Sequence, residues 1–166
     1  MSEKAVLISM NKPHTDNIFT HKKKKVEWRK KPLPLTTNYC YETKNKGGCG
    51  KVIGQFDVVQ NVEFDPLNHR LYSLDFIEDG CVPIEDLIEY ANGDVIWGNV
   101  LENIERYDKP CELSEFKQVR KISRYHKKDE PKTERIYIQA LLHSSRVEVK
   151  YLTRPPQSWC YVEVQE

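Results

Sequence analysis

Residues 8–31 read ISMNKPHTDNIFTHKKKKVEWRKK, and this stretch contains the signals that decide the fold. It begins within an apolar, partly β-branched run at residues 5–10, which predicts a first strand. Pro13 suits the first turn of a helix, and Ile18 and Phe19 can face a core. We therefore expect a strand followed directly by a short helix.

The end of the same stretch predicts a second strand. Val26 and Trp28 alternate with charged residues, which is the period-two pattern of a half-buried strand. Val26 and Trp28 would form its apolar face, and the opposite face would carry Lys25, Glu27 and Arg29.

The remainder of the chain adds strands and few helices. The clearest helix spans residues 83–93, where apolar residues recur on one face, and a helical turn is expected at 112–116. Residues 65–82 are expected to be irregular, and the charged residues 117–135 to form a surface excursion. Further strands are predicted at residues 38–43, 51–64 with a bend at Gly54, 94–110 and 159–164, and as a hairpin of residues 136–142 with 146–152.

These elements predict an α+β fold, mainly β, in which the strands form a mixed, closed or nearly closed barrel with two or three short helices. The length of 166 residues fits a single domain over residues 1–166. No apolar run is long enough to cross a membrane and no signal peptide is evident, so a cytoplasmic location is expected. The five cysteines lack metal-site spacing and are expected to be reduced.

The N-terminal stretch resembles the opening of ASCH-domain proteins, which belong to the PUA-like group. Their pattern is a strand, a Lys-Pro step, a short helix and then Gly-x-Lys-x-x-Glu-x-Arg. Lys12 and Pro13 match the Lys-Pro step, and Lys24, Glu27 and Arg29 match the later positions. One position departs from the pattern, because Lys22 stands where the family usually has glycine, so a turn with positive φ would be harder to form.

Three later segments continue the resemblance in order: residues 48–58, 82–116 and 154–163, the last similar to a branch found in bacteria and phages. The ordered series is more specific than the N-terminal motif alone. The resemblance implies a PUA-like barrel with a basic cleft beside the Glu-x-Arg strand, and binding of RNA or a modified nucleotide in that cleft. The histidines are scattered along the sequence without the spacing of ligands, so no metal site and no cofactor are expected.

Residues of the Glu-x-Arg strand and its basic flanks are the candidate binding site. An arginine can hold a phosphate through two parallel hydrogen bonds, and a local cluster of lysines attracts phosphates. The alternatives are a surface ion pair between Glu27 and Arg29, and a solvated lysine-rich turn that protects a strand edge. The candidate nucleic-acid-binding residues are Lys12, Lys22, Lys24, Glu27, Arg29, Lys30 and Trp159.

A hydrolase acting on RNA or a nucleoside is the second hypothesis. One ASCH branch hydrolyses an acylated cytidine nucleoside with a lysine, a threonine and a glutamate, and Lys24 aligns with that lysine. The threonine would lie three residues further on, where this chain has Glu27, so the mechanism cannot be transferred. Lys24 with Glu27, or with Glu78, would then be the acid–base pair.

A third hypothesis is a protein-interaction domain, which the net charge of +1 keeps open. It predicts an apolar surface patch and no basic cleft. Trp28 and Trp97 are expected in the core, whereas Trp159 follows a Pro-Pro turn and is a candidate for the mouth of a cleft.

Overall fold

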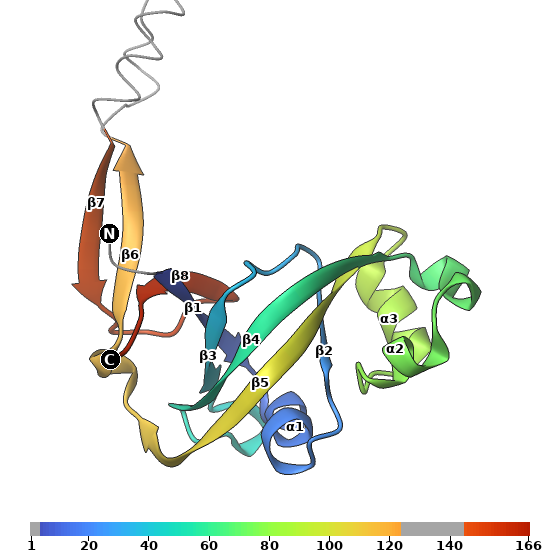
Figure 1. Ribbon diagram of the computed structural model, residues 1–166, viewed down its shortest axis with the longest axis horizontal. Coiled ribbons are helices and arrows are strands. Elements are labelled where there is room, and N and C mark those ends of the chain that lie inside the picture. The colour runs from blue at the N-terminus through green and yellow to red at the C-terminus, as the bar shows by residue number, and fades with distance from the viewer. Residues whose placement is uncertain (1–3, 124–144) are drawn as a thin grey trace, which may run out of the picture.

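The structure is a computed structural model that describes residues 4–123 and 145–166. One eight-stranded mixed sheet, in the order β2-β5-β4-β3-β1-β8-β6-β7, organises these residues (Figure 1). Only β1 and β3 pair in parallel among the described strands. The strands are β1 (Lys4–Met10), β2 (Val26–Arg29), β3 (Thr37–Glu42), β4 (Lys51–Phe64), β5 (Ile96–Cys111), β6 (Lys117–Ser123), β7 (Ser145–Tyr151) and β8 (Trp159–Glu163).

Short helices fill the connections. The helix predicted after β1 is present as α1 (Lys12–Thr15), which continues as the π-helix η1 (Asp16–Thr20). The predicted helix near residue 83 is α3 (Ile84–Ala91), and it ends at Asn92 in the left-handed conformation. The stretch 65–82, expected to be irregular, holds the 3₁₀ segment η3 (Pro66–Leu71) and α2 (Leu74–Glu78). Two further 3₁₀ turns are η2 (Asn45–Gly47) and η4 (Leu113–Glu115).

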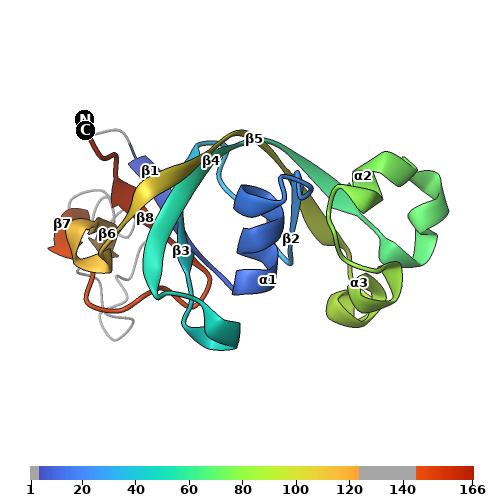
Figure 2. The ribbon, with the colours of Figure 1, turned by 90° about the horizontal axis from the view of Figure 1, so that it is seen from below.

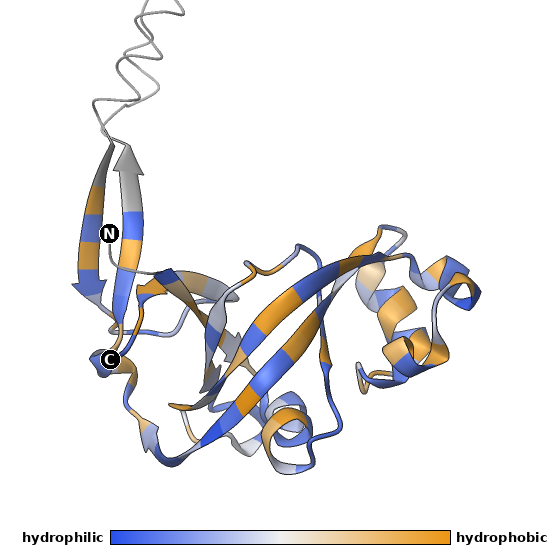
Figure 3. Ribbon diagram, in the orientation of Figure 1, coloured by the Kyte–Doolittle hydropathy of each residue, from blue (hydrophilic) through white to orange (hydrophobic). Residues whose placement is uncertain are grey.

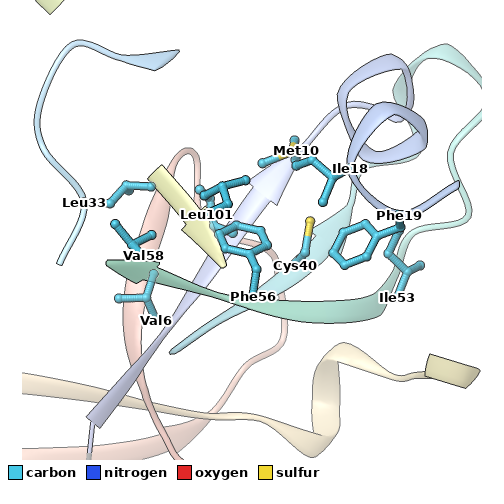
Figure 4. Close-up of a cluster of buried hydrophobic side chains, with 11 residues drawn as sticks. Val6, Met10, Ile18, Phe19, Leu33, Cys40, Ile53, Phe56, Val58 and Leu101 are labelled. Carbon is cyan, nitrogen blue, oxygen red and sulfur yellow. The ribbon is translucent and has the colours of Figure 1, made fainter. Parts of the chain in front are cut away.

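Strand β1 lies between two hydrophobic clusters, which is why its sequence is apolar at nearly every position. Val6 and Ile8 point into one cluster, while Ala5 and Leu7 point into the other, as the alternation of a strand requires. The first cluster includes Ile18 and Phe19 of the predicted helix, together with side chains of β3, β4 and β5 (Figure 4). The core therefore fixes where α1 and η1 lie against the sheet.

β2 is buried on both faces, contrary to the half-buried strand predicted, and a third cluster covers the face that carries Val26 and Trp28. Trp28 packs on Phe64 and Phe76, with ring centroids at 4.7 Å and 5.3 Å. Leu87 of α3 joins the same cluster, and Glu27 on the other face is only 5% exposed. The helices α2 and α3 form one end of the molecule in both views (Figures 1 and 2).

The sheet curls strongly, so that its first strand returns towards its middle. Four strand spacings separate β2 from β1 in the sheet order, which is about 19 Å in a flat sheet. Arg29 of β2 nevertheless donates from Nη2 to the carbonyl oxygen of Ser9 in β1 at 3.2 Å. An arginine side chain cannot span the flat distance, so the sheet must fold round between these strands.

Strands β6 and β7 form an arm at the end opposite α2 and α3 (Figures 1 and 2). Residues 117–123 were expected to begin a surface excursion, but they form β6, which pairs with both β7 and β8. Polar and apolar residues alternate along β7 (Figure 3), and Val147 and Val149 are exposed. The rest of the predicted excursion and the expected hairpin partner of β7, residues 136–142, lie outside the described residues.

The prediction for β4 is confirmed. β4 has the predicted bounds, and its pairing with β5 shifts register between Val52 and Gly54, where the bend was expected. The five cysteines are free. Trp97 was expected in the core but is half-buried and outside the three clusters. Within residues 4–123 and 145–166, no helix has the length and apolar character needed to span a membrane.

Candidate functional site

A pocket of about 550 Å³ opens where the end of β1, α1, β2 and α3 meet. β1, α1 and β2 contribute Ser9, His14, Glu27 and Arg29 to its polar lining, and α3 contributes Asp86 and Tyr90. The lining residues are Ser9, Met10, Asn11, His14, Lys24, Glu27, Trp28, Arg29, Thr43, Asn45, Val82, Asp86, Leu87, Tyr90 and Gln157.

Three charged side chains from the predicted motif lie together in this pocket. Lys24 Nζ donates to Gly80 O at 2.6 Å and lies 3.3 Å from Glu27 Oε2. Arg29 Nε donates to the other carboxylate oxygen, Glu27 Oε1, at 2.8 Å. We call Lys24, Glu27 and Arg29 the charged triad.

Arg29 also ties the triad to two other segments. Its Nη2 donates to Ser9 O on β1, and its Nη1 donates to Ser158 Oγ at 3.3 Å. Ser9 N in turn donates to Ser158 O at 2.8 Å. The arginine therefore holds together the ends of β2, β1 and the segment before β8, and the alternative of an isolated surface ion pair does not describe it.

The environment of the triad keeps Glu27 ionised. Burial alone would raise the pKa of the Glu27 carboxyl, but the charges of Lys24 and Arg29 outweigh that effect and hold the pKa below its ordinary range. Two cations thus share one carboxylate, which leaves the triad with a net charge of +1. Asp86 on the wall formed by α3 adds one negative charge to the pocket lining.

His14 brings an uncharged group to the same pocket. Burial lowers the pKa of its imidazole, and Lys24 and Arg29 oppose protonation further while Glu27 favours it. Its Nδ1 is buried and has no hydrogen-bond partner among the described residues. The ring is therefore neutral at neutral pH, with one nitrogen unused by the fold.

The backbone explains why Lys24 is buried inside a run of lysines. Lys22 adopts a φ of 54°, so the turn with positive φ forms even though this position carries lysine. Lys24 N then donates to Asn17 O at 3.0 Å, and Val26 N donates to Asp79 O at 3.0 Å. These bonds turn Lys24 inwards to 1% exposure, while Lys22, Lys23 and Lys25 remain exposed.

Asn99 on β5 fixes the strand that carries the triad. Its Nδ2 donates to Glu27 O at 2.8 Å, and its Oδ1 accepts from Leu33 N and Asn61 Nδ2, each at 2.8 Å. A buried amide with satisfied donors and acceptors locks its neighbours in register. β2 is only four residues long, so this support sets the position of Glu27 and Arg29.

The remaining predicted binding residues lie outside the pocket lining. Lys12 is half-buried, Lys22 is exposed, and Lys30 lies outside the pocket with Nζ 5.2 Å from the ring centre of the lining residue Tyr90. Trp159 packs against the first hydrophobic cluster and edge-on to Tyr161 rather than lining the pocket. Glu78 is exposed at the end of α2 and does not line the pocket.

Several site residues were not predicted. Ser9, Ser158 and Gly80 accept hydrogen bonds from the triad. Arg29 donates to Ser9 O and Ser158 Oγ, and Lys24 donates to Gly80 O. No sequence pattern marks such acceptors. Asp86 and Tyr90 lie four positions apart on α3, so one face of the predicted helix could have suggested them. No group of three or more potential metal-ligating side chains occurs in the described part of the chain.

The architecture defines a class: an α+β, mainly β fold with an ASCH-like arrangement of strands and short helices. The ASCH protein of Zymomonas mobilis has a similar structure, with a TM-score of 0.55 and 18% identity over 86% of this chain and 96% of that chain. A variant of that protein with one serine replaced by alanine gives a TM-score of 0.60 and 17% identity, over 98% of this chain and 89% of that chain. A tyrosine-to-phenylalanine variant gives 0.53 and 20%, over 67% and 77%.

No protein-family model and no curated protein sequence matches the chain. At these levels of identity the structural likeness establishes the ASCH-like fold.

Proposed function

We propose that this protein binds RNA and that the pocket around the charged triad receives one nucleotide of it. The observation that carries the proposal is the position of Lys24, Glu27 and Arg29, which are held rigidly in a pocket of about 550 Å³. Pockets of this volume are typical of small-ligand sites, where a few fixed polar groups give specificity.

The triad retains hydrogen-bonding capacity for a ligand. Arg29 has five N–H donors and uses three in the bonds described above, within the described residues. Those that remain can hold a phosphate or a base carbonyl, because a guanidinium forms charge-assisted hydrogen bonds with such oxygens. Tyr90 also lines the pocket, and at 40% exposure it offers ring surface to a base.

The lysines outside the pocket support the proposal in a second way. Lys22, Lys23, Lys25 and Lys30 are exposed around the ends of the segment that carries the triad. They would attract the phosphate backbone without contacting the nucleotide in the pocket. Binding of RNA is consistent with the expected cytoplasmic location and with the ASCH-like fold.

The test is a titration with short single-stranded RNA and with ribonucleoside monophosphates, followed by fluorescence and calorimetry. We expect saturable binding that weakens with salt and is lost in Arg29→Ala. The matched control is Arg70→Ala, because Arg70 is exposed on η3 and lines no pocket described here. Equal binding by wild type and Arg29→Ala would reject this site.

Hydrolysis of RNA or a nucleoside is a second candidate, which the state of His14 favours. A neutral imidazole in the pocket can accept a proton from water or a hydroxyl group. Glu27 is a weaker base than the sequence suggested, because its two cationic partners lower its pKa. Turnover that is lost in His14→Gln while RNA binding persists would establish this activity; binding without turnover in wild type would reject it.

Exposed leucines are the observation that favours the protein-interaction hypothesis. Leu67, Leu71 and Leu74 are 64%, 84% and 66% exposed on neighbouring turns of η3 and α2. This hypothesis requires RNA binding to be absent, so the RNA titration described above decides between RNA binding and protein interaction.

A further inference from the structure

A second pocket of about 550 Å³ lies between the β6–β7 arm and the segment that leads into β8. We infer that it holds the phosphate backbone of the RNA whose nucleotide enters the first pocket. The inference rests on the proposed function, and it implies that the ligand is single-stranded RNA of several nucleotides. The lining residues are Gln118, Arg120, Lys150, Tyr151, Leu152, Thr153, Arg154, Pro155, Pro156 and Gln157.

The second pocket is the more basic of the two. Its lining includes Arg120, Lys150 and Arg154 and contains no aspartate or glutamate. Lys150 pairs with Glu148 at 2.7 Å, but neither arginine forms an ion pair within residues 4–123 and 145–166. Even with Glu148 counted beside them, the three cations leave a net charge of +2, which suits phosphate groups.

The strand register explains how these charges converge. Gln118 of β6 lies opposite Lys150 of β7, and Arg120 lies opposite Glu148. Since alternate residues of a strand share a face, Gln118, Arg120 and Lys150 lie on one face of the arm. Arg154 reaches the same pocket from the segment that follows β7.

The two pockets adjoin at Gln157, which lines both. The segment between them is fixed rather than loose, because Ser9 Oγ donates to Pro156 O at 2.7 Å and Arg29 holds Ser158. A strand with one nucleotide beside Arg29 would therefore cross Gln157 and reach Arg120 and Arg154. A base can enter the first pocket only when it is unpaired, so single-stranded RNA fits this path better than a duplex.

Charge removal at the second pocket tests the inference. We expect Arg120→Ala with Arg154→Ala to weaken binding of a single-stranded RNA of about ten nucleotides by about tenfold near 150 mM salt. The slope of log affinity against log salt concentration should become shallower by about 1.4. This is about 0.7 for each of the phosphates that the variant no longer neutralises. Binding of a ribonucleoside monophosphate to the first pocket should be unchanged.

The control removes two equally exposed charges elsewhere, Arg70→Ala with Lys109→Ala, and should leave both affinities unchanged. All four replaced side chains are exposed, and thermal unfolding checks that each variant is folded. Unchanged RNA binding in the Arg120, Arg154 variant, or an equal loss for RNA and mononucleotide, would overturn the inference. Failure of the proposed function looks different, because wild type would then bind neither ligand.

Discussion

Arg29 on β2 donates a hydrogen bond to the backbone carbonyl of Ser9 on β1 at 3.2 Å, although three strands separate β2 from β1 in the sheet. The same guanidinium holds Glu27 at 2.8 Å. One side chain therefore links the two curled ends of the sheet and also helps to fix the geometry of the candidate site. This link explains why residues of β1, β2 and the segment before β8 meet in one pocket.

Arg29→Lys should impair binding almost as much as Arg29→Ala. Lysine keeps the charge but lacks the planar arrangement of donors that reaches Glu27, Ser9 and Ser158 together. We expect RNA affinity to fall at least tenfold, which corresponds to about 1.4 kcal/mol. Calorimetric titration of both variants checks this, and near-normal binding by Arg29→Lys would show that charge alone suffices.

Glu27→Gln should destabilise the fold more than Lys24→Met. Loss of the carboxylate leaves both Lys24 and Arg29 without their counter-ion, at a cost of about 3–5 kcal/mol in the free energy of unfolding. Lys24→Met leaves Glu27 paired with Arg29, so its cost should be smaller.

Adding Lys24→Met to Glu27→Gln should recover part of the lost stability, because one buried unpaired charge is removed. Denaturant unfolding of the two single variants and the double variant measures this coupling. Additive losses would contradict a buried ion pair between Lys24 and Glu27.

The stability of the protein should decrease as the pH falls below about 6.5, partly because of His14. Burial lowers the pKa of His14 from 6.5, so the unfolded chain binds more protons than the folded chain between the folded value and 6.5. Glu27 acts in the same direction at lower pH, since its folded pKa also lies below the ordinary value of 4.5.

His14→Gln should therefore make the unfolding free energy less dependent on pH between about 7.5 and about 5. His21→Gln is the control, because His21 is exposed and lies outside the pocket. Denaturant unfolding at several pH values gives the slopes. Identical slopes for wild type and His14→Gln would contradict a neutral, buried His14.

Gly80→Ala should disturb the site through packing. A methyl group at Gly80 would collide with the indole of Trp28, and the Gly80 carbonyl is the acceptor of the Lys24 bond. We expect a loss of about 1–3 kcal/mol in stability and a change in tryptophan fluorescence. Gly93→Ala, where nothing lies within 4 Å of the added carbon, should leave the fluorescence unchanged, although the φ of 85° at Gly93 makes alanine costly in stability there too.

The strands near the core were predictable because their apolar periodicity reports burial directly. β1 and β4 show this, and so does the apolar face of η1, where Ile18 and Phe19 enter the core as expected. β2 was predicted as a strand but not as a fully buried one. On its second face Glu27 is enclosed by Lys24 and Arg29. Arg29 is in turn held by Ser9 and Ser158, and partners so distant in sequence leave no mark on a local pattern.

β6 was missed for the opposite reason. β6 pairs with β7, and the two strands project from the rest of the sheet (Figure 1). A charged sequence can therefore form this strand with little apolar burial. Lys24, Glu27 and Arg29 were predicted as a site by their resemblance to the ASCH pattern, and the structure brings these three together. The other predicted binding residues came from the Lys-Pro step, the lysine-rich flanks and the Pro-Pro turn. They do not line the pocket: Lys12, Lys22, Lys30 and Trp159.

The most direct test of the central claim is titration of the wild-type protein and Arg29→Ala with single-stranded RNA of about ten nucleotides at about 50 mM and about 200 mM salt. The account predicts saturable binding by wild type that weakens with salt, and its loss in Arg29→Ala. Absence of binding at the lower salt, or equal binding by the two proteins, would contradict it.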